Sequence, residues 1–206
     1  MLENLPDALG HVLHDFRAGM DKLAFNTCGL RTGLSALSVT SLAFADHAPI
    51  PERYTADGEG VSPPLQWSGV PANAASLVLI VEDADAPLPL PLVHAIVVDL
   101  DAANGGLPEG ALSSSGHEGS HMHEGRNSYF MSRWLPPDPP PGHGPHRYVF
   151  QLFVLGAGDP FGGTPGRDAV MDAVRERGIA AGCLIGTYAR SDGSISLGSQ
   201  PQMAAG

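Results

Sequence analysis

Three carboxylates fall within four residues of the segment VEDADAP, residues 81–87. Glu82, Asp83 and Asp85 follow the apolar run SLVLI, whose composition is typical of a buried strand. Carboxylates next to a buried strand need donors or cations that offset the loss of water. They either cap the strand or form half of a binding site whose other half lies further along the chain.

Imidazole and phenol groups later in the chain could supply that other half. His94 lies inside the apolar stretch PLVHAIVVDL, and in HRY, residues 146–148, His146 and Tyr148 share one face of an extended strand while Arg147 points to the other. Such groups can donate to anion oxygens, and a nearby carboxylate can fix a histidine tautomer. A mixed pocket of this kind suits a phosphate group on a ligand that also carries an amine. Singly, His94 and Tyr148 are equally consistent with core residues.

These carboxylate, histidine and tyrosine residues lie in or beside short apolar runs that predict strands. From residue 37 onward, β-branched and aromatic runs are separated by long loops rich in glycine and proline. A helix is predicted over residues 164–178, with Thr164 as N-cap, Pro165 at the first helical position and Gly178 at its end. The pattern predicts a mainly β sandwich with antiparallel or mixed sheets and few peripheral helices. The predicted strand runs are LSVTSLAF, SLVLIVE, LVHAIVVDL, HRYVFQLFVL and CLIGTYAR.

An N-terminal amphipathic helix is predicted over residues 4–24, because apolar residues recur there at three- and four-residue steps. Such a stripe must be buried, either on the chain's own sandwich or against a second copy. We expect the second arrangement, a homodimer in which residues 1–30 supply much of the interface. The expected organisation is a helical arm and linker at 1–36, a sandwich domain at 37–200 and a frayed tail at 201–206.

Composition excludes several classes of protein. The formal net charge of −11 argues against a nucleic-acid surface. No apolar run reaches the roughly 20 residues of a membrane span, and the N-terminus lacks the basic segment of a signal peptide. We therefore expect a cytoplasmic protein without a transmembrane segment. Cys28 and Cys183 are too few for a disulfide framework and are expected to be buried thiols.

A second cluster of possible ligands lies in HEGSHMHEG, residues 117–125. His117, His121 and His123 occur there with Glu118 and Glu124. The glycines and serines disfavour the helix that would align His117 and His121. We expect a polar loop rather than a specific metal site, and we expect no cofactor, although a metal-binding loop remains an alternative.

Several ordered motifs together resemble one known family. DGEGVSPPLQW, SLVLIVEDADAP, the strand histidine and PPPGHGPHRYVFQLFVL are similar to segments of the phosphatidylethanolamine-binding protein family, in its bacterial Raf-kinase-inhibitor-like branch. The resemblance covers roughly residues 46–200. It implies a central β-sandwich with a small, preformed anion pocket.

The resemblance also implies roles for particular residues. It implies that four residues bind the ligand or anion, and that Asp85 and Pro87 shape the loop. It further implies a cis Ala86–Pro87 bond, while strand alternation makes Arg147 an ion-pair partner outside the pocket. The four implied ligand-binding residues are Asp83, His94, His146 and Tyr148.

The implied function is non-enzymatic binding of phosphate-type anions or phosphoethanolamine-like head groups, with inhibition or regulation of a kinase or protease as a further expectation. The alternative is a hydrolase that uses Asp83 with His94 or His146 as acid and base. Neither a GxSxG motif nor a GxxxxGK[ST] phosphate loop is present, and no catalytic residue is assigned.

Overall fold

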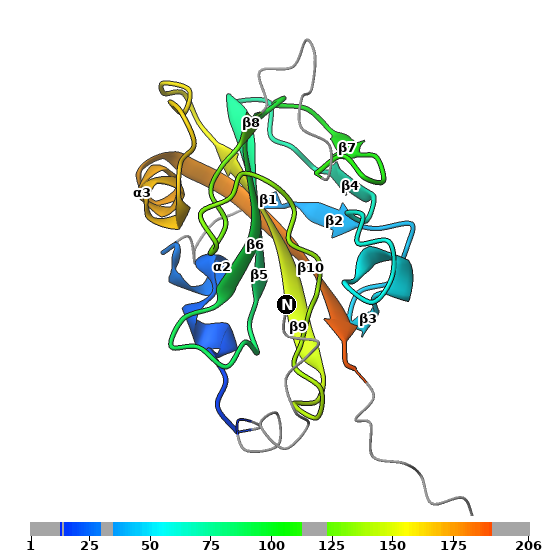
Figure 1. Cartoon of the computed structure of the whole chain (residues 1–206). Helices are drawn as coiled ribbons and strands as arrows, with labels where there is room; N and C mark the ends of the chain where they lie inside the picture. The colour runs from blue at the N-terminus through cyan, green and yellow to red at the C-terminus, as the bar shows by residue number, and fades with distance from the viewer. Residues whose placement is uncertain (1–12, 14, 30–34, 113–122, 191–206) are drawn as a thin grey trace, which may run out of the picture.

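The computed structural model describes residues 13, 15–29, 35–112 and 123–190. Two β-sheets pack face to face in this part of the chain, so the predicted mainly β sandwich is confirmed (Figure 1). The smaller sheet has the order β2 (Ser38–Thr40), β4 (Leu65–Ser68), β7 (Gly105–Leu107). The larger sheet has the order β1 (Ser35–Ala36), β10 (Gly178–Tyr188), β9 (His146–Leu155), β5 (Ser76–Asp83), β6 (Leu92–Leu100), β8 (His123–Glu124), and β3 (Ala48–Pro49) pairs with β10.

The main core fills the space between the two sheets. Alternate residues of β5 and β9, such as Leu79 and Leu152, point toward the smaller sheet, which contributes Leu65 and Trp67. The central strands β5 and β9 are nearly continuous apolar runs because both of their faces are covered. Their ends therefore place any polar side chain on a rigid support.

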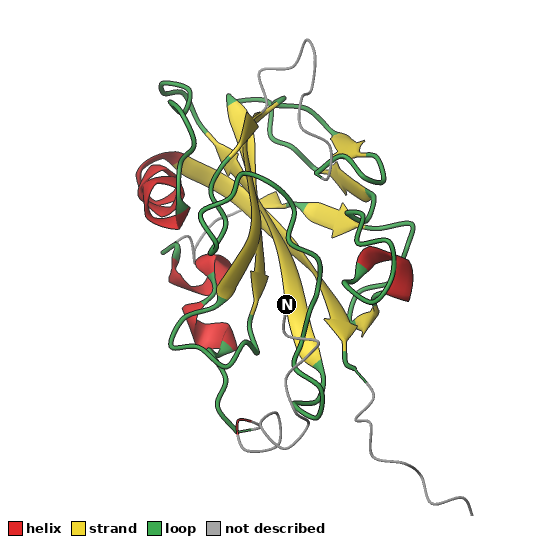
Figure 2. Ribbon diagram, in the orientation of Figure 1, coloured by secondary structure: helices red, strands yellow, loops and turns green. Residues whose placement is uncertain are grey.

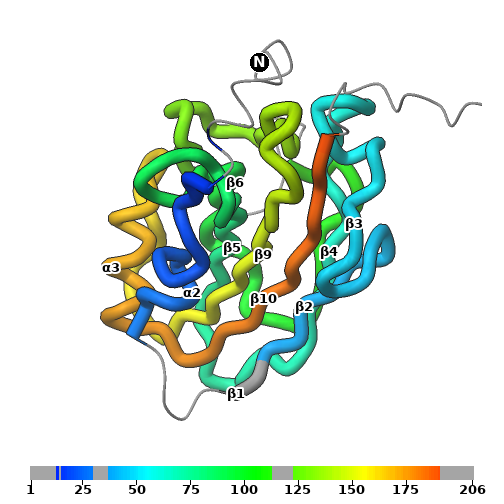
Figure 3. The backbone as a smooth tube through the Cα atoms, turned by 90° about the horizontal axis from the view of Figure 1, so that it is seen from below, coloured from blue at the N-terminus to red at the C-terminus, as the bar shows by residue number. Residues whose placement is uncertain are grey.

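The helices cover the opposite face of the larger sheet. Figure 3 shows α3 (Arg167–Arg177) and α2 (Ala24–Thr27) on one side of β5 and β9, with β2 and β4 on the other. Val170 and Met171 of α3 pack with Val78 and Phe153 of the sheet. Two short 3-10 turns, Met20–Lys22 and Glu52–Tyr54, complete the helical elements of the described residues (Figure 2).

The start of α3 differs from the sequence prediction. The helix begins at Arg167 after Gly166, and no side chain caps it, so Thr164 is not the N-cap and Pro165 is not helical. The carbonyl groups of Thr164 and Pro165 instead accept hydrogen bonds from the side chain and backbone of Arg126. This pairing holds residues 164–165 outside the helix. The predicted end is confirmed, because the helix stops at Arg177 before Gly178.

The predicted N-terminal helix is not continuous where the structure describes it: Leu13 is helical and Met20–Lys22 form a 3-10 turn, but a non-helical segment lies between them. Residues 16–19 are not helical, and Gly19 adopts a φ of 101°, which interrupts a helix. The Ala18 and Gly19 amides donate to the carbonyl groups of Ala86 and Ala84, so this segment binds its own sandwich. Residues 4–12 and 14 lie outside the described part. The homodimer through residues 1–30 stays a prediction.

The Ala86–Pro87 bond is trans, which corrects the cis bond expected from the resemblance. Side-chain and backbone hydrogen bonds hold the turn in this form. The Asp85 amide donates to Asp83 Oδ1 at 2.8 Å, and the Leu88 amide donates to the Ala86 carbonyl at 2.7 Å.

No helix among the described residues is long and apolar enough to cross a membrane. The cytoplasmic location stays a prediction. Cys28 and Cys183 are free thiols, the first buried and the second partly exposed.

We expect Gly182→Ala to destabilise the fold. A Cβ at Gly182 would lie 2.1 Å from the Leu37 carbonyl oxygen, so the backbone beside β10 would have to shift. Overpacking of this kind costs about 1–3 kcal/mol. Chemical denaturation of the two proteins measures the difference in the free energy of unfolding. Gly162→Ala is the matched control because no atom lies within 4 Å of its Cβ position; equal losses in both variants would contradict the packing argument.

Candidate ligand-binding pocket

Strand alternation separates the carboxylates that the sequence places together. Asp83 ends β5 on the inner face, whereas Glu82 points to the outer face. Glu82 is fully buried and accepts hydrogen bonds from Arg167 Nε at 2.6 Å and from Gln151 Nε2 and the Ala24 amide at 2.8 Å each. It therefore joins α2 and α3 to the sheet and lies away from the inner face.

Asp85 holds the loop rather than sharing the side of Asp83. The strand ends at Asp83, so the extended geometry that would align the two carboxylates is lost. Asp85 binds the Arg147 guanidinium at 2.6 and 2.7 Å and lies 3.1 Å from Arg17 Nη1. Although burial alone would raise the pKa of Asp85, the hydrogen bonds from Arg147 lower it below its usual value. The predicted ion-pair role of Arg147 is confirmed.

A β-bulge directs His94 to the inner face. Val81 pairs with Ala95 and Glu82 pairs with Val93, so His94 is the extra residue of β6. Its ring makes an edge-to-face contact with Tyr148, at 5.1 Å between centroids. Tyr148 reaches the same place from β9, where it pairs with Asp83.

These elements enclose one end of a pocket of about 550 Å³. Asp83, His94 and His146 line it, and Pro87 forms part of its wall. Tyr148 lies behind them, fully buried and stacked at 6.3 Å on the His146 ring. The structure thus gathers the four predicted binding residues at one place. Apolar residues form much of the remaining wall, among them Leu88, Leu92, Met131 and Leu135.

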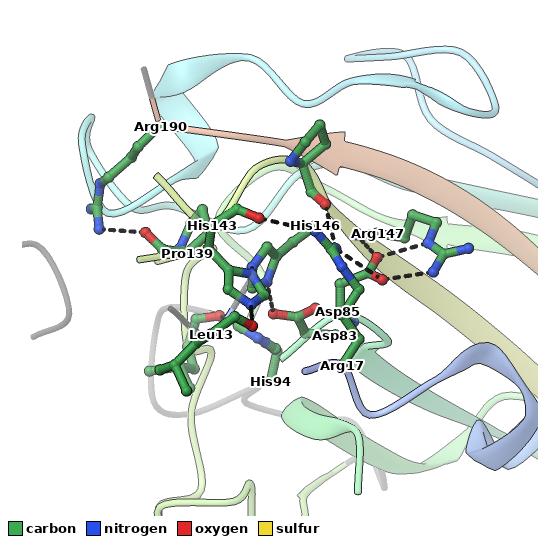
Figure 4. A network of polar contacts seen from close by, with 12 residues as sticks. Leu13, Arg17, Asp83, Asp85, His94, Pro139, His143, His146, Arg147 and Arg190 are labelled. Carbon is green, nitrogen blue, oxygen red and sulfur yellow. Dashed lines mark hydrogen bonds and ion pairs between the residues drawn. The ribbon is translucent and has the colours of Figure 1, made fainter. Parts of the chain in front are cut away.

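A chain of hydrogen bonds runs from the pocket to the N-terminal segment (Figure 4). His146 Nδ1 lies 2.7 Å from Asp83 Oδ2, and its Nε2 lies 2.7 Å from His143 Nδ1. His143 Nε2 lies 2.8 Å from the Leu13 carbonyl oxygen. Arg17 also donates to the carbonyl group of His143, at 2.9 Å. The segment around residues 13–17 therefore contacts the same histidines that reach the pocket.

Proton counting constrains the charge of this chain of hydrogen bonds. Its three hydrogen bonds need three protons. With Asp83 ionised, the two terminal groups only accept, so the four ring nitrogens carry all three protons and one histidine is a cation. Burial and the neighbouring His146 lower the pKa of His143. The chain of hydrogen bonds then carries no net charge.

Three buried polar atoms on neighbouring rings lack hydrogen-bond partners among the described residues, His94 Nε2, the Tyr148 hydroxyl and Trp134 Nε1, and of these residues only His94 lines the pocket. The other ring nitrogen of His94 lies 2.6 Å from the Leu135 carbonyl oxygen. Burial lowers the pKa of His94 despite the nearby charge of Asp83, and burial raises the pKa of Tyr148 well above its usual value. Both groups are therefore neutral at neutral pH.

A further ion-pair network borders the pocket. Asp138 lines it and pairs with Arg190 at 2.6 Å, and Arg190 also binds Asp57 at 2.7 Å. The hydrogen bonds from Arg190 hold the pKa of Asp57 below its usual value. These contacts keep Asp138 compensated, and Arg133 is the one arginine among the described residues that line the pocket.

No group of three metal-ligating side chains occurs in the part of the chain that the structure describes. His117, Glu118 and His121 of the predicted polar loop lie outside that part. Glu124 is described, and burial raises its pKa to about 7.

Sequence reasoning missed His143, Arg17, Asp138 and Arg190. The GHGPHRY segment places His143 three residues before His146, a spacing that a turn can bring together. No local signal connects Arg17 or Arg190 to the pocket, because their partners lie more than fifty residues away.

The fold and the pocket define a β-sandwich binding protein with a compact polar site at the end of its central strands. The model of the phosphatidylethanolamine-binding protein family matches residues 40–189. The chain therefore belongs to the phosphatidylethanolamine-binding protein family. Membership supports a binding-protein kind of role.

Relatives of known sequence and structure agree with this assignment. A UPF0098 protein of Mycobacterium tuberculosis is 38% identical, with 74% of this chain and 70% of the relative covered. A UPF0098 protein of Methanothermobacter thermautotrophicus is 34% identical over 75% of this chain and 99% of the relative. The structure of a homolog from Chlamydia trachomatis has a TM-score of 0.68 at 34% identity, covering 76% and 99% of the two chains. Escherichia coli YbcL has a TM-score of 0.69 at 26% identity, covering 75% and 99%.

We expect His94 to make the protein less stable in acid. Its folded-state pKa is depressed, so the unfolded chain takes up the proton more readily. Stability is then lost as the pH falls below the ordinary histidine pKa of about 6.5, at up to about 1.4 kcal/mol per pH unit for one proton. Urea denaturation of the wild type and His94→Phe at several pH values measures the slope.

The variant should show a shallower loss of stability below that pH. His47→Asn removes a histidine that is largely exposed and should leave the slope unchanged. An identical slope in His94→Phe and the wild type would contradict the buried, neutral state of His94.

Proposed function

We propose that the chain is a non-enzymatic binding protein whose pocket takes a phosphate-type anion or a phosphoethanolamine-like head group. The single observation that carries the proposal is a pair of buried polar atoms without hydrogen-bond partners among the described residues, His94 Nε2 and the Tyr148 hydroxyl. Buried polar groups are normally hydrogen-bonded, so two unsatisfied ones on rings in contact are consistent with a ligand. His94 lines the pocket and Tyr148 packs behind it, which supports the same interpretation in a member of this family.

The charges of the pocket suit a small ligand of mixed polarity. His146 balances Asp83, so the inner carboxylate does not by itself exclude an anion. Arg133 supplies positive charge, and Asp83 can still attract an ammonium group on the same ligand. The apolar wall formed by Leu88, Leu92 and Met131 suits the carbon atoms that join the two charged ends.

The hydrolase alternative has weaker support. A general base needs a free nitrogen that faces the substrate; both ring nitrogens of His146 are engaged, by Asp83 and His143, so only His94 Nε2 is left for that role. Among the described residues that line the pocket, none is a serine, threonine, cysteine or lysine nucleophile. These features favour binding over covalent catalysis.

A regulatory role would follow from the same pocket. The N-terminal segment contacts His143 and Asp85, so occupancy of the pocket could be sensed at the protein surface. Inhibition of a kinase or protease and dimerisation through residues 1–30 remain expectations from the sequence, and we propose no particular enzyme partner.

We expect Tyr148→Phe to weaken binding of phosphoethanolamine. The change removes one hydroxyl donor, and a hydrogen bond to a charged ligand contributes about 1.5–3 kcal/mol, equivalent to about tenfold or more in Kd. Isothermal titration calorimetry on the full chain measures the affinity. Tyr54→Phe is the control, because it removes a hydroxyl that binds Glu109 away from the pocket lining.

Failure of the wild-type chain to bind either phosphoethanolamine or inorganic phosphate would overturn the proposed function. Equal affinities in the wild type and Tyr148→Phe would remove Tyr148 from the site while leaving the pocket itself in place.

A further inference from the structure

The backbone fixes which nitrogen of His94 carries the proton. His94 Nδ1 lies 2.6 Å from the Leu135 carbonyl oxygen, and a carbonyl oxygen can only accept. Nδ1 must therefore be protonated, and in the neutral ring Nε2 is a lone-pair acceptor. The buried edge that His94 offers to a ligand accepts a hydrogen bond rather than donating one.

The surroundings of His94 keep it in this neutral form. Burial opposes a second proton, and the charge of Asp83 offsets that effect only in part. The neighbouring His146 also lowers the pKa of His94, and the ring of Trp134 lies 6.2 Å away between centroids. The titratable groups that face His94 are Asp83 from β5, His146 and Tyr148 from β9, and Asp138 from the loop after Leu135.

The inner end of the pocket presents two acceptors from its lining residues, the Asp83 carboxylate and His94 Nε2. His146 Nε2 is engaged by His143. Two buried donors near His94 have no hydrogen-bond partner in the described part of the chain, the Tyr148 hydroxyl and Trp134 Nε1, and neither residue belongs to the pocket lining. A fully ionised oxyanion placed here would set an oxygen lone pair against the lone pair of His94, which is unfavourable in a buried site.

We propose that the pocket selects oxyanions that still carry a proton, with the ligand's P–OH donating to His94 Nε2 and the Tyr148 hydroxyl donating to another ligand oxygen. The selected class is inorganic phosphate or a phosphate monoester in its monoanionic form. Sulfate and phosphodiesters have no such proton and are disfavoured. The inference rests on the proposed function and makes His94 the residue that determines specificity.

A matched set of ligands tests the proposal on the full chain. Phosphate and sulfate have the same tetrahedral shape. Phosphoethanolamine and glycerophosphoethanolamine carry the same ammonium group, but phosphoethanolamine is a monoester and glycerophosphoethanolamine is a diester.

Calorimetry at about pH 5.5 and pH 8 covers both sides of the second pKa of a phosphate monoester, which is near 6. We expect phosphate and phosphoethanolamine to bind better at the lower pH, with Kd rising about tenfold per pH unit well above that pKa. Sulfate and glycerophosphoethanolamine should bind at least about tenfold more weakly than their partners.

His94→Gln supplies the matched variant. A glutamine amide can present N–H donors, so this variant should narrow the gap between sulfate and phosphate. Selective 15N labelling of the histidines provides a second readout, because His94 should remain a neutral ring with unprotonated Nε2 in the phosphate complex.

The outcomes separate the two proposals. Sulfate that binds as tightly as phosphate at low pH, or a protonated His94 Nε2 in the complex, would overturn the selection of protonated ligands and leave the anion site standing. Phosphate affinity that does not fall with rising pH would have the same effect. Absence of binding by all four ligands would overturn the proposed function itself.

Discussion

Three buried carboxylates within four residues impose the constraint on which the site depends. Glu82, Asp83 and Asp85 are at most 3% exposed, and a buried charge is tolerated only when it is paired. Alternation and the turn after β5 send them in three directions, so each must find its own partners. Glu82 joins α2 and α3 to the sheet, Asp83 holds the pocket histidine, and Asp85 fixes the loop and the N-terminal segment. Residues 82–85 thus hold three separate parts of the structure: the helices, the pocket, and the loop with the N-terminal segment.

The sandwich was predictable from local regularities of the sequence, whereas the set of four pocket residues followed from the family resemblance. Strand periodicity predicts β5, β6, β9 and β10, and the two-residue repeat places His146 and Tyr148 on one face. The position of Asp83 follows from the same rule. Periodicity alone could not place His94, because the β-bulge at Val81 and Glu82 changes the register of β6.

The failed predictions share a physical cause, which is that tertiary contacts override local preference. An apolar repeat and good helix-forming residues predict a helix through residue 24, but Gly19 and the backbone hydrogen bonds from Ala18 and Gly19 to Ala86 and Ala84 keep residues 16–19 out of a helix. Thr164 and Pro165 form a favourable helix start in isolation, yet Arg126 occupies both of their carbonyl groups. The contacts of Arg17 and His143 near the pocket were not predicted, because their partners come close only in the folded chain.

The proposed anion site is compatible with the net charge of −11. Affinity at a buried site depends on the groups within a few ångströms rather than on overall charge, since salt screens the distant ones. Here His146 offsets Asp83 and Arg190 offsets Asp138, so the two acidic residues of the lining carry compensated charges. Hydrogen-bonding capacity remains unsatisfied among the described residues at His94 and Tyr148. The Leu135 carbonyl group makes His94 Nε2 an acceptor, so in the proposed site the direction of this hydrogen bond bears on ligand choice alongside the charges.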